Sequence, residues 1–231
     1  PIAMSGVTDA YQPAEREFQL TRRCLQVAWE SRQPVSIFTK NALVTRDLDI
    51  LAQMASLGLV HVALSLTTLD QTLSRVMEPR TSSPAARLEA IARLNEAGVP
   101  TAVLVAPVIP GLNDVEIPAI LQAAKDQGTG SARYTLLRLP AAVQPVFCEW
   151  LQQARPAQRA RIESLIRSTH DGAMCETQFH ARMRGTGEFA AQIQRTFELF
   201  AQRYGLAPEP APLDVTRFRR PQPTSGQLRL F

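Results

Sequence analysis

The sequence predicts an α/β fold built on a parallel sheet, and three observations support this prediction. Short β-branched runs alternate with longer segments whose apolar residues recur at helical spacing. The connections between these segments are short, which suits right-handed crossovers between parallel strands. The strands are almost continuously apolar, as strands covered on both faces are. Two architectures stay open, a doubly wound sheet and a sheet curled toward a barrel, although five strands cannot close an eight-stranded barrel.

Each element is supported by its own residues. The expected strands are short apolar runs at Ile2–Gly6, Val35–Thr39, His61–Leu66, Thr101–Pro107 and Ala132–Leu139. The expected helices between them carry apolar residues three and four apart, at Pro13–Glu30, Thr45–Leu57, Ser83–Ala97 and Asp114–Gln127. Polar side chains that can cap the helix starts are Thr45, Ser83 and Asn113, and glycines that can end helices are Gly58, Gly98 and Gly128.

Three parts follow one another along the chain. Residues 1–140 hold the five strand-helix alternations. Residues 141–206 form a helical C-terminal layer, in which the expected helices are Ala141–Ala154, Pro156–Thr169 and Glu188–Tyr204. Residues 207–231 are rich in proline and poor in apolar side chains, which predicts a flexible tail.

Composition excludes several classes of protein. A chain of 231 residues that is 45% hydrophobic and 20% charged is long and apolar enough for one large core, so it is not a disordered chain. Its apolar runs are shorter than the roughly 18 residues of a membrane span, so no membrane association is expected. Three widely spaced cysteines argue against a disulfide framework and predict a cytoplasmic protein. The net charge of +4 comes from residues 151–231, with 12 basic and 7 acidic side chains.

Candidate site residues lie where the strands end, because ligands of parallel α/β proteins meet the loops at the carboxyl ends of the strands. Lys40 follows the apolar run VSIFT directly, an unusual place for a surface lysine. It is either a functional cation or a strand-end lysine that extends to solvent. Asp9 follows the first strand and could equally cap the next helix.

Other reactive side chains have simpler interpretations. Glu78 and Arg87 flank a loop and a helix start, where a surface ion pair is expected. Cys24 falls within an apolar helical pattern and is expected in the core rather than as a nucleophile. The histidines are too scattered for a zinc site; they are His61, His170 and His180.

Five strings in a fixed order carry a family resemblance. They are TDAYQPAEREFQLTR, SIFTKNALVTRDLDIL, ALSLTTLD, MEPR with the following SxxxRLEAI, and APVIPGLND. Over roughly residues 1–205 the chain resembles radical SAM proteins of the spore photoproduct lyase-like, or DNA repair photolyase-like, group. The resemblance implies a partial (β/α)6 TIM-like barrel, S-adenosylmethionine (SAM) as cofactor, and a [4Fe–4S] cluster held by a CxxxCxxC loop after the first strand.

The chain departs from that group at the cluster, because it contains no CxxxCxxC. Its cysteines, Cys24, Cys148 and Cys175, are 124 and 27 residues apart, unlike a tight loop that gives three thiolates to one cluster. Five strands in place of six fit the same explanation, a barrel that lacks the first βα unit. We favour a truncated chain, with the cluster only in a full-length parent, over a naturally cluster-free homologue.

The resemblance also implies roles for individual residues. Thr8 and Asp9 match strand-end residues near the SAM amino group, and Lys40 matches a ligand of the SAM carboxylate. Ser65 and Thr67 lie where related enzymes bind the ribose, Arg87 where a cation can approach the carboxylate, and 105–108 where backbone meets adenine. The related lyases place a hydrogen-donating cysteine where this chain has Gly6 or Val7. Reversal of thymine dimers by that route is therefore not expected, and no catalytic residue is identified in this chain.

The last five residues resemble the QLxLF peptide by which bacterial repair proteins bind the sliding clamp. Leu230 and Phe231 could enter an apolar groove while Gln227 supplies a polar anchor and Leu228 completes the pattern; Arg229 replaces the usual Ser or Asp. The opposite interpretation is an apolar end of a disordered tail. Arg217, Arg219 and Arg220 could add weak affinity for phosphates.

Three functions are compatible with these features. The first is the SAM-binding part of a radical SAM enzyme that acts on nucleic acid in DNA repair, inactive as this chain alone. The second is a non-enzymatic module that is recruited to the clamp and has lost the chemistry. The third is a radical SAM enzyme with a substrate other than DNA.

Overall fold

A computed structural model describes residues 1–5, 8–174 and 184–220. Five strands form its sheet: β1 (Ile2–Met4), β2 (Val35–Thr39), β3 (Val60–Ser65), β4 (Thr101–Val108) and β5 (Ser131–Leu136). The α-helices are α1 (Glu15–Phe18), α2 (Leu20–Glu30), α3 (Leu48–Ala55), α4 (Gln71–Met77), α5 (Pro84–Glu96), α6 (Ile117–Asp126), α7 (Gln144–Ala154), α8 (Arg159–Ser168) and α9 (Gly187–Arg203). Short 3-10 helices span Ala42–Asp47, Asp114–Glu116 and Pro156–Gln158.

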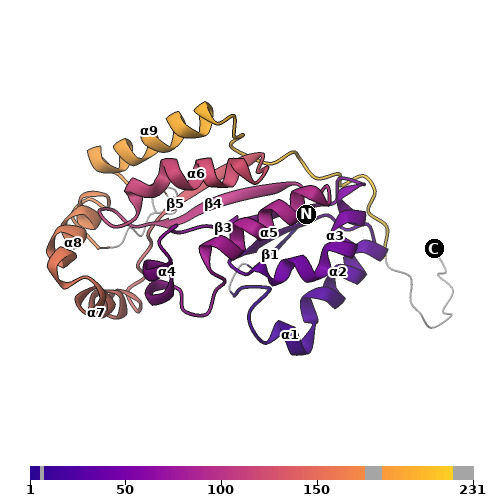
Figure 1. The fold of residues 1–231 in the computed structure, drawn as a ribbon, viewed down its shortest axis with the longest axis horizontal. Helices are drawn as coiled ribbons and strands as arrows, with labels where there is room; N and C mark the ends of the chain where they lie inside the picture. The colour runs from indigo at the N-terminus through magenta and orange to yellow at the C-terminus, as the bar shows by residue number, and fades with distance from the viewer. Residues whose placement is uncertain (6–7, 175–183, 221–231) are drawn as a thin grey trace.

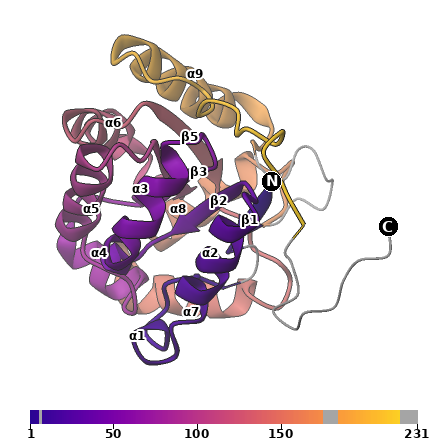
Figure 2. The same ribbon diagram turned by 90° about the vertical axis from the view of Figure 1, so that its right-hand side faces the viewer.

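The sheet confirms the predicted α/β class and resolves its winding. All neighbouring strands are parallel and follow one another in chain order, β1-β2-β3-β4-β5. A doubly wound sheet reverses its strand order at a switch point, whereas one-directional winding is that of a barrel. Figures 1 and 2 show the sheet with helices packed along its outside. The fold is a partial barrel.

The core lies between the sheet and its helices. In β2, Val35, Ile37 and Thr39 are buried and the alternating residues are half-buried. One core cluster joins β2 and β3 to α2, α3 and α5, and a second joins β4 and β5 to α6 and α9. The β2 alternation means that one sheet face packs under helices while the other lines the open side of the partial barrel.

Several helix boundaries differ from the sequence prediction. The helix expected over 13–30 is two helices, because Gln19 adopts a left-handed conformation with φ of 50° between α1 and α2. Helix α4 is not among the helices that the sequence predicts; the Asp70 carboxylate caps it by accepting from the amides of Thr72 and Leu73. The Ser83 side chain caps α5 as predicted. Thr45 does not cap a helix as predicted, because it lies within the 3-10 helix Ala42–Asp47, which Asn41 caps.

Strand β1 and helix α2 expose more apolar surface than the sequence predicts. The prediction that strands are buried on both faces is wrong for β1, where Ile2 is 52% exposed. The prediction that Cys24 lies in the core is also wrong, because its side chain is exposed. β1 is the edge strand of the sheet, so it pairs with β2 on one side and among the described residues has no strand on the other. Strand β5 is shorter than expected, ending at Leu136.

This edge is expected to make the chain self-associate. Ile2, Leu20 and Val27 are each more than half exposed and line one apolar cavity of about 640 Å³. Contiguous apolar surface beside a sheet edge promotes association. The apparent mass from light scattering should rise with protein concentration, and Val27→Lys should reduce that rise. Leu199→Lys, on exposed α9 surface, is the matched control; a concentration-independent monomer would contradict the expectation.

Residues 207–220 run as a strap along the amino ends of the strands. Ala207 pairs with Ser131 at the start of β5, the Asp214 amide donates to the Gly58 carbonyl before β3, and the Arg219 amide donates to the Ser31 carbonyl before β2. Figure 1 shows this segment in yellow leaving α9 toward the end of the molecule where α2 and α3 lie. The QLRLF peptide lies outside the described residues.

No helix among the residues that the structure describes has the length and apolar character needed to cross a bilayer.

Candidate functional site

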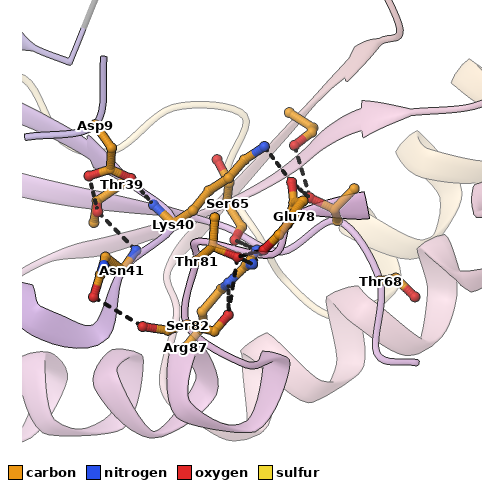
Figure 3. A network of polar contacts seen from close by, with 12 residues as sticks. Asp9, Thr39, Lys40, Asn41, Ser65, Thr68, Glu78, Thr81, Ser82 and Arg87 are labelled. Atoms are coloured by element: carbon orange, nitrogen blue, oxygen red, sulfur yellow. Dashed lines mark hydrogen bonds and ion pairs between the residues drawn. The ribbon is translucent and has the colours of Figure 1, made fainter. Parts of the chain in front are cut away.

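A polar cluster forms at the carboxyl ends of the central strands. Lys40 follows β2 directly, Ser65 ends β3, and Thr67 lies two residues further on. Glu78 comes from the end of α4 and Arg87 from the first turns of α5. Figure 3 shows the Lys40 and Arg87 side chains directed toward Glu78. The five residues Lys40, Ser65, Thr67, Glu78 and Arg87 are called the Glu78 cluster below.

Glu78 is the acceptor at the centre of the cluster. Its Oε1 accepts from Lys40 Nζ at 2.5 Å and from Thr67 Oγ1 at 2.9 Å, and its Oε2 accepts from Arg87 Nη2 at 2.8 Å. The Glu78 side chain is only 8% exposed and Arg87 1%, whereas Lys40 is 30% exposed. One buried carboxylate therefore faces two cations, and of these the lysine is the one that solvent reaches.

The Arg87 guanidinium is hydrogen-bonded to several protein groups. Its Nε donates to the Ser82 carbonyl at 2.8 Å, its Nη1 to the Ser65 carbonyl at 2.9 Å, and its Nη2 to Glu78 and to Thr81 Oγ1. A buried guanidinium needs such partners, because each unpaired N–H would lose its hydration. The expectation of a surface ion pair between Glu78 and Arg87 is wrong: the pair is buried and joins α4 and α5 to β3.

The environment lowers the pKa of Glu78. Burial alone would raise it, but the nearby charges of Lys40 and Arg87 and their hydrogen bonds outweigh burial. A carboxylate with a lowered folded-state pKa stabilises the fold fully above its unfolded pKa, and the contribution is lost as the pH falls through the folded value. Glu78 is therefore an anion at neutral pH.

This pKa predicts how acid affects stability. Wild-type protein should lose the stabilisation from Glu78 as the pH falls below the carboxyl's ordinary value of 4.5. Glu78→Gln, which has no carboxyl to protonate, should be less stable at pH 7 and should lose less on going to pH 3.5. Urea unfolding at both pH values measures this. Equal losses for both proteins would show that Glu78 has no lowered pKa.

Asp9 joins the loop after β1 to the end of β2. Its Oδ1 accepts from the Tyr11 amide at 2.8 Å and from Thr39 Oγ1 at 2.7 Å, and its Oδ2 accepts from the Lys40 amide at 2.7 Å. Asp9 thus holds the backbone of Lys40 while the lysine side chain extends toward Glu78 (Figure 3). Thr8 is exposed beside it.

A buried charge network supports this loop from below. Tyr11 Oη donates to Asp47 Oδ2 at 3.1 Å, and Asp47 is also paired with Arg22 and Arg46. Burial, then the charge of Asp47, raises the pKa of Tyr11, so the phenol stays protonated as the donor. Because Tyr11 is fully buried, it anchors the loop that carries Asp9.

Asn113 connects the loops that follow β3 and β4. The sequence predicts it as a helix cap, but its buried side chain has other partners: Oδ1 accepts from the Ile109 amide at 2.6 Å, and Nδ2 donates to the carbonyls of Thr67 at 2.7 Å and Pro107 at 3.0 Å. These bonds hold Thr67 against the end of β4. The PGLND string therefore has a structural role at the site.

The structure brings most of the predicted site residues together, in two groups. The Lys40 side chain is 30% exposed; Ser65 is only 8% exposed, but among the described residues its hydroxyl has no hydrogen-bond partner. Thr67 and Arg87 are buried and bonded to protein groups. A cavity of about 460 Å³ adjoins Asp9 and is lined by Asn41, Arg80 and Thr81. Sequence reasoning missed Glu78 as a site residue, although the MEPR string contains it.

The described residues do not fit a [4Fe–4S] cluster. Such a cluster takes thiolates from closely spaced cysteines, but Cys24 lines the cavity beside β1 and Cys148 packs in the cluster of α7 and α8. No group of three metal-ligating side chains occurs among the described residues. Cys175 and His180 lie outside them. Lys40 supplies an ammonium that can pair with an anionic group of a ligand.

Comparison with known proteins adds the family. The sequence profile of the Radical SAM superfamily matches residues 2–124. An uncharacterized protein of Mycobacterium tuberculosis is 34% identical over 168 residues, 72% of this chain and 49% of that protein. One of Methanocaldococcus jannaschii is 37% identical over 115 residues, 50% of this chain and 43% of that protein. The chain thus spans about half the length of these relatives.

A solved structure agrees on the fold. A mutant of spore photoproduct lyase superposes with a TM-score of 0.53 over 82% of this chain and 55% of that chain, at 15% sequence identity. At this identity the likeness concerns the fold alone, and it matches the partial barrel described above. The profile covers more than half of the sequence, including β1 to β4 and all five residues of the Glu78 cluster. The chain belongs to the Radical SAM superfamily.

Proposed function

We propose that this chain is the SAM-binding part of a radical SAM enzyme. The observation that carries the proposal is the partly exposed side chain of Lys40 at the carboxyl ends of the strands, where ligands of parallel α/β folds bind. Lys40 is one of only two lysines in the sequence. It lies between two carboxylates, Asp9 and Glu78, and only Glu78 pairs with its ammonium.

The residues around Lys40 divide the work of holding the cofactor. Lys40 Nζ pairs with the SAM carboxylate, and the free Ser65 hydroxyl bonds a polar group of the same ligand. Asp9, with the neighbouring Thr8, sits where the SAM amino group is expected and has an unused lone pair. When SAM and a reduced cluster are bound, they supply a 5′-deoxyadenosyl radical.

In this proposal the [4Fe–4S] cluster is bound by residues outside this sequence. The 231 residues contain no CxxxCxxC, and the described cysteines lie apart. Alone, the chain is expected to bind SAM without cleaving it. The alternatives are a cluster-free binding module and a radical SAM enzyme whose substrate is not DNA; an in-frame upstream CxxxCxxC would separate the first alternative from the proposal.

The test of SAM binding is calorimetric. We expect the 231-residue chain to bind S-adenosylhomocysteine, an unreactive analogue that keeps the amino acid group, and Lys40→Ala to weaken binding by about tenfold, since a charge-assisted hydrogen bond to a carboxylate is worth roughly 1.5 kcal/mol. Lys125→Ala, at an exposed lysine of α6, should leave affinity unchanged. Equal affinity for wild type and Lys40→Ala would overturn the proposal.

We further propose nucleic acid as the substrate class and the DNA sliding clamp as a partner. Residues 151–231 carry the positive charge of the chain, 12 basic against 7 acidic side chains, which suits phosphate binding. The strap ends its described course near Ser31, before β2, at the opposite end of the strands from Lys40. In the proposal the clamp binds Gln227, Leu228, Leu230 and Phe231, which lie outside the described residues.

Deletion of 227–231 tests the clamp proposal. The intact chain should co-elute with a purified bacterial sliding clamp, and the deleted chain should not, because the peptide provides the apolar anchors. Phe231→Ala alone should give most of the loss. Unchanged co-elution after deletion would end this proposal without affecting SAM binding.

A further inference from the structure

We propose that Glu78 is a positioning residue that directs Lys40 toward the cofactor carboxylate, and that Arg87 and Thr67 hold Glu78 without touching the cofactor. The inference deepens the proposed function and rests on it. It assigns to Glu78 a role at the site, and it gives Arg87 and Thr67 roles different from the ligand contacts expected from the sequence.

Glu78 restricts the conformational freedom of the Lys40 side chain. A lysine has four methylene groups, and an unheld ammonium samples many rotamers that a ligand must restrict on binding. Here one N–H of Lys40 is held by Glu78 Oε1 at 2.5 Å. The ammonium has two further N–H donors, for which the described residues offer no other acceptor, and its side chain is 30% exposed. The held lysine therefore presents donors to a ligand at one fixed place.

Glu78 is itself held by hydrogen bonds to both of its oxygens. Thr67 Oγ1 and Arg87 Nη2 bond its two different oxygens, at 2.9 and 2.8 Å. Arg87 is tied in turn to the carbonyls of Ser65 and Ser82. The position of the Glu78 carboxylate is thus fixed relative to the end of β3 as well as to α4, unlike that of a surface glutamate.

Hydrogen bonds also join the backbone segments that carry Glu78 and Lys40. The Ser82 amide donates to the Lys40 carbonyl at 3.2 Å, and Ser82 Oγ accepts from the Ala42 amide at 2.9 Å. Asp9 holds the Lys40 amide from the other side at 2.7 Å. Hydrogen bonds therefore join the loop that follows Glu78 to the strand end that carries Lys40. The Lys40 side chain is held at its backbone by these bonds and at its ammonium by Glu78.

The charges around Glu78 favour an anionic ligand. Arg87 alone would neutralise Glu78 in its buried place, so the second cation is not needed to compensate the carboxylate. Among the charged groups that pair with Glu78, Lys40 leaves one positive charge in excess on the accessible side, since the Asp9 carboxylate bonds the Lys40 amide and not its ammonium. That excess suits one carboxylate of an incoming amino acid group. Removal of Glu78 would leave two like charges and a lysine without a fixed direction.

A double-mutant cycle on S-adenosylhomocysteine affinity tests the inference. Glu78→Gln should weaken binding about fivefold when Lys40 is present and less than twofold in a Lys40→Met background, because the effect passes through Lys40. Thr67→Val, which keeps the carboxylate and removes one of its bonds, should repeat this pattern at smaller size and serves if Glu78→Gln folds poorly. Equal losses in both backgrounds would overturn the inference while leaving the SAM site intact.

A second measurement needs no ligand. In protein labelled with ¹⁵N-lysine, only Lys40 and Lys125 give Nζ signals. The Lys40 signal should be observable because its protons are held, and Glu78→Gln should broaden it to the level of Lys125. A Lys40 signal unaffected by Glu78→Gln would also overturn the inference. Failure of the wild type to bind the analogue, with the held signal present, would instead overturn the proposed function, and the positioning role with it.

Discussion

Replacement of Arg87 by Met is expected to lower the free energy of unfolding by about 3 kcal/mol or more, because removing one partner of a buried ion pair leaves the other uncompensated. Met fills a similar volume, so a cavity is not the cause. The loss includes the buried carbonyls of Ser65 and Ser82, which would lack the donors that Arg87 Nη1 and Nε supply. Urea unfolding at pH 7 measures the effect.

Arg93→Met is the matched control, since it removes an arginine from the exposed face of the same helix. Its Nη1 bonds only the hydroxyl of Thr45 at 3.2 Å, and a change within about 0.5 kcal/mol is expected for such a surface site. If Arg87→Met were as mild as Arg93→Met, the Glu78 cluster would not be a buried, mutually dependent unit.

Replacement of Asn113 by Asp is expected to cost about 3 kcal/mol at pH 7. The carboxylate can still accept from the Ile109 amide, but it cannot donate to the carbonyls of Thr67 and Pro107, which Asn113 Nδ2 contacts at 2.7 and 3.0 Å. Three oxygen atoms would then face one another in a site that has no exposure. The change is nearly isosteric, so packing is conserved.

The cost of Asn113→Asp should depend on pH. An unpaired buried carboxyl has a raised folded-state pKa, so its penalty is absent below the unfolded value near 4 and grows as the pH rises above it. Urea unfolding should therefore show a smaller deficit at pH 4.5 than at pH 7. Gln26→Glu, on the exposed face of α2, should show little deficit at either pH. An equal deficit at both pH values would show that the charge of the buried carboxylate does not contribute to the cost.

Much of the fold could be predicted from local patterns. The strands at 35–39 and 101–107 are found almost where the apolar runs predict them, because short runs rich in apolar and β-branched residues are a local signal. The Ser83 cap and the helix that follows it are likewise local features. The choice between a doubly wound sheet and a barrel could not be made, because strand order depends on which strands pair across the chain.

The errors have physical reasons in tertiary contacts. Helix α4 has only seven residues, and too few turns for a clear period. The edge position of β1 exposes Ile2, although its sequence is as apolar as that of a central strand. Cys24 has an apolar helical pattern around it, but α2 turns this face toward the open edge of the sheet.

The site shows the same division. Lys40 could be recognised because a lysine directly after a buried strand is unusual. Glu78 could not, since a glutamate between a short helix and a loop resembles any surface residue until Arg87, nine residues later, is known to reach it. Asn113 looked like a cap because caps and buried linkers use the same side chain, and only its partners on β3 and β4 distinguish them.

The most direct measurement of the central claim is a titration of ¹³C-lysine-labelled protein with S-adenosylhomocysteine, followed by NMR. The two lysines of the sequence give two ε-carbon signals, which Lys40→Ala assigns. SAM binding at the Glu78 cluster predicts that the Lys40 signal shifts in a saturable way while the signal of exposed Lys125 does not move. Saturable binding that leaves Lys40 unshifted, or an equal shift of both signals, would contradict the account.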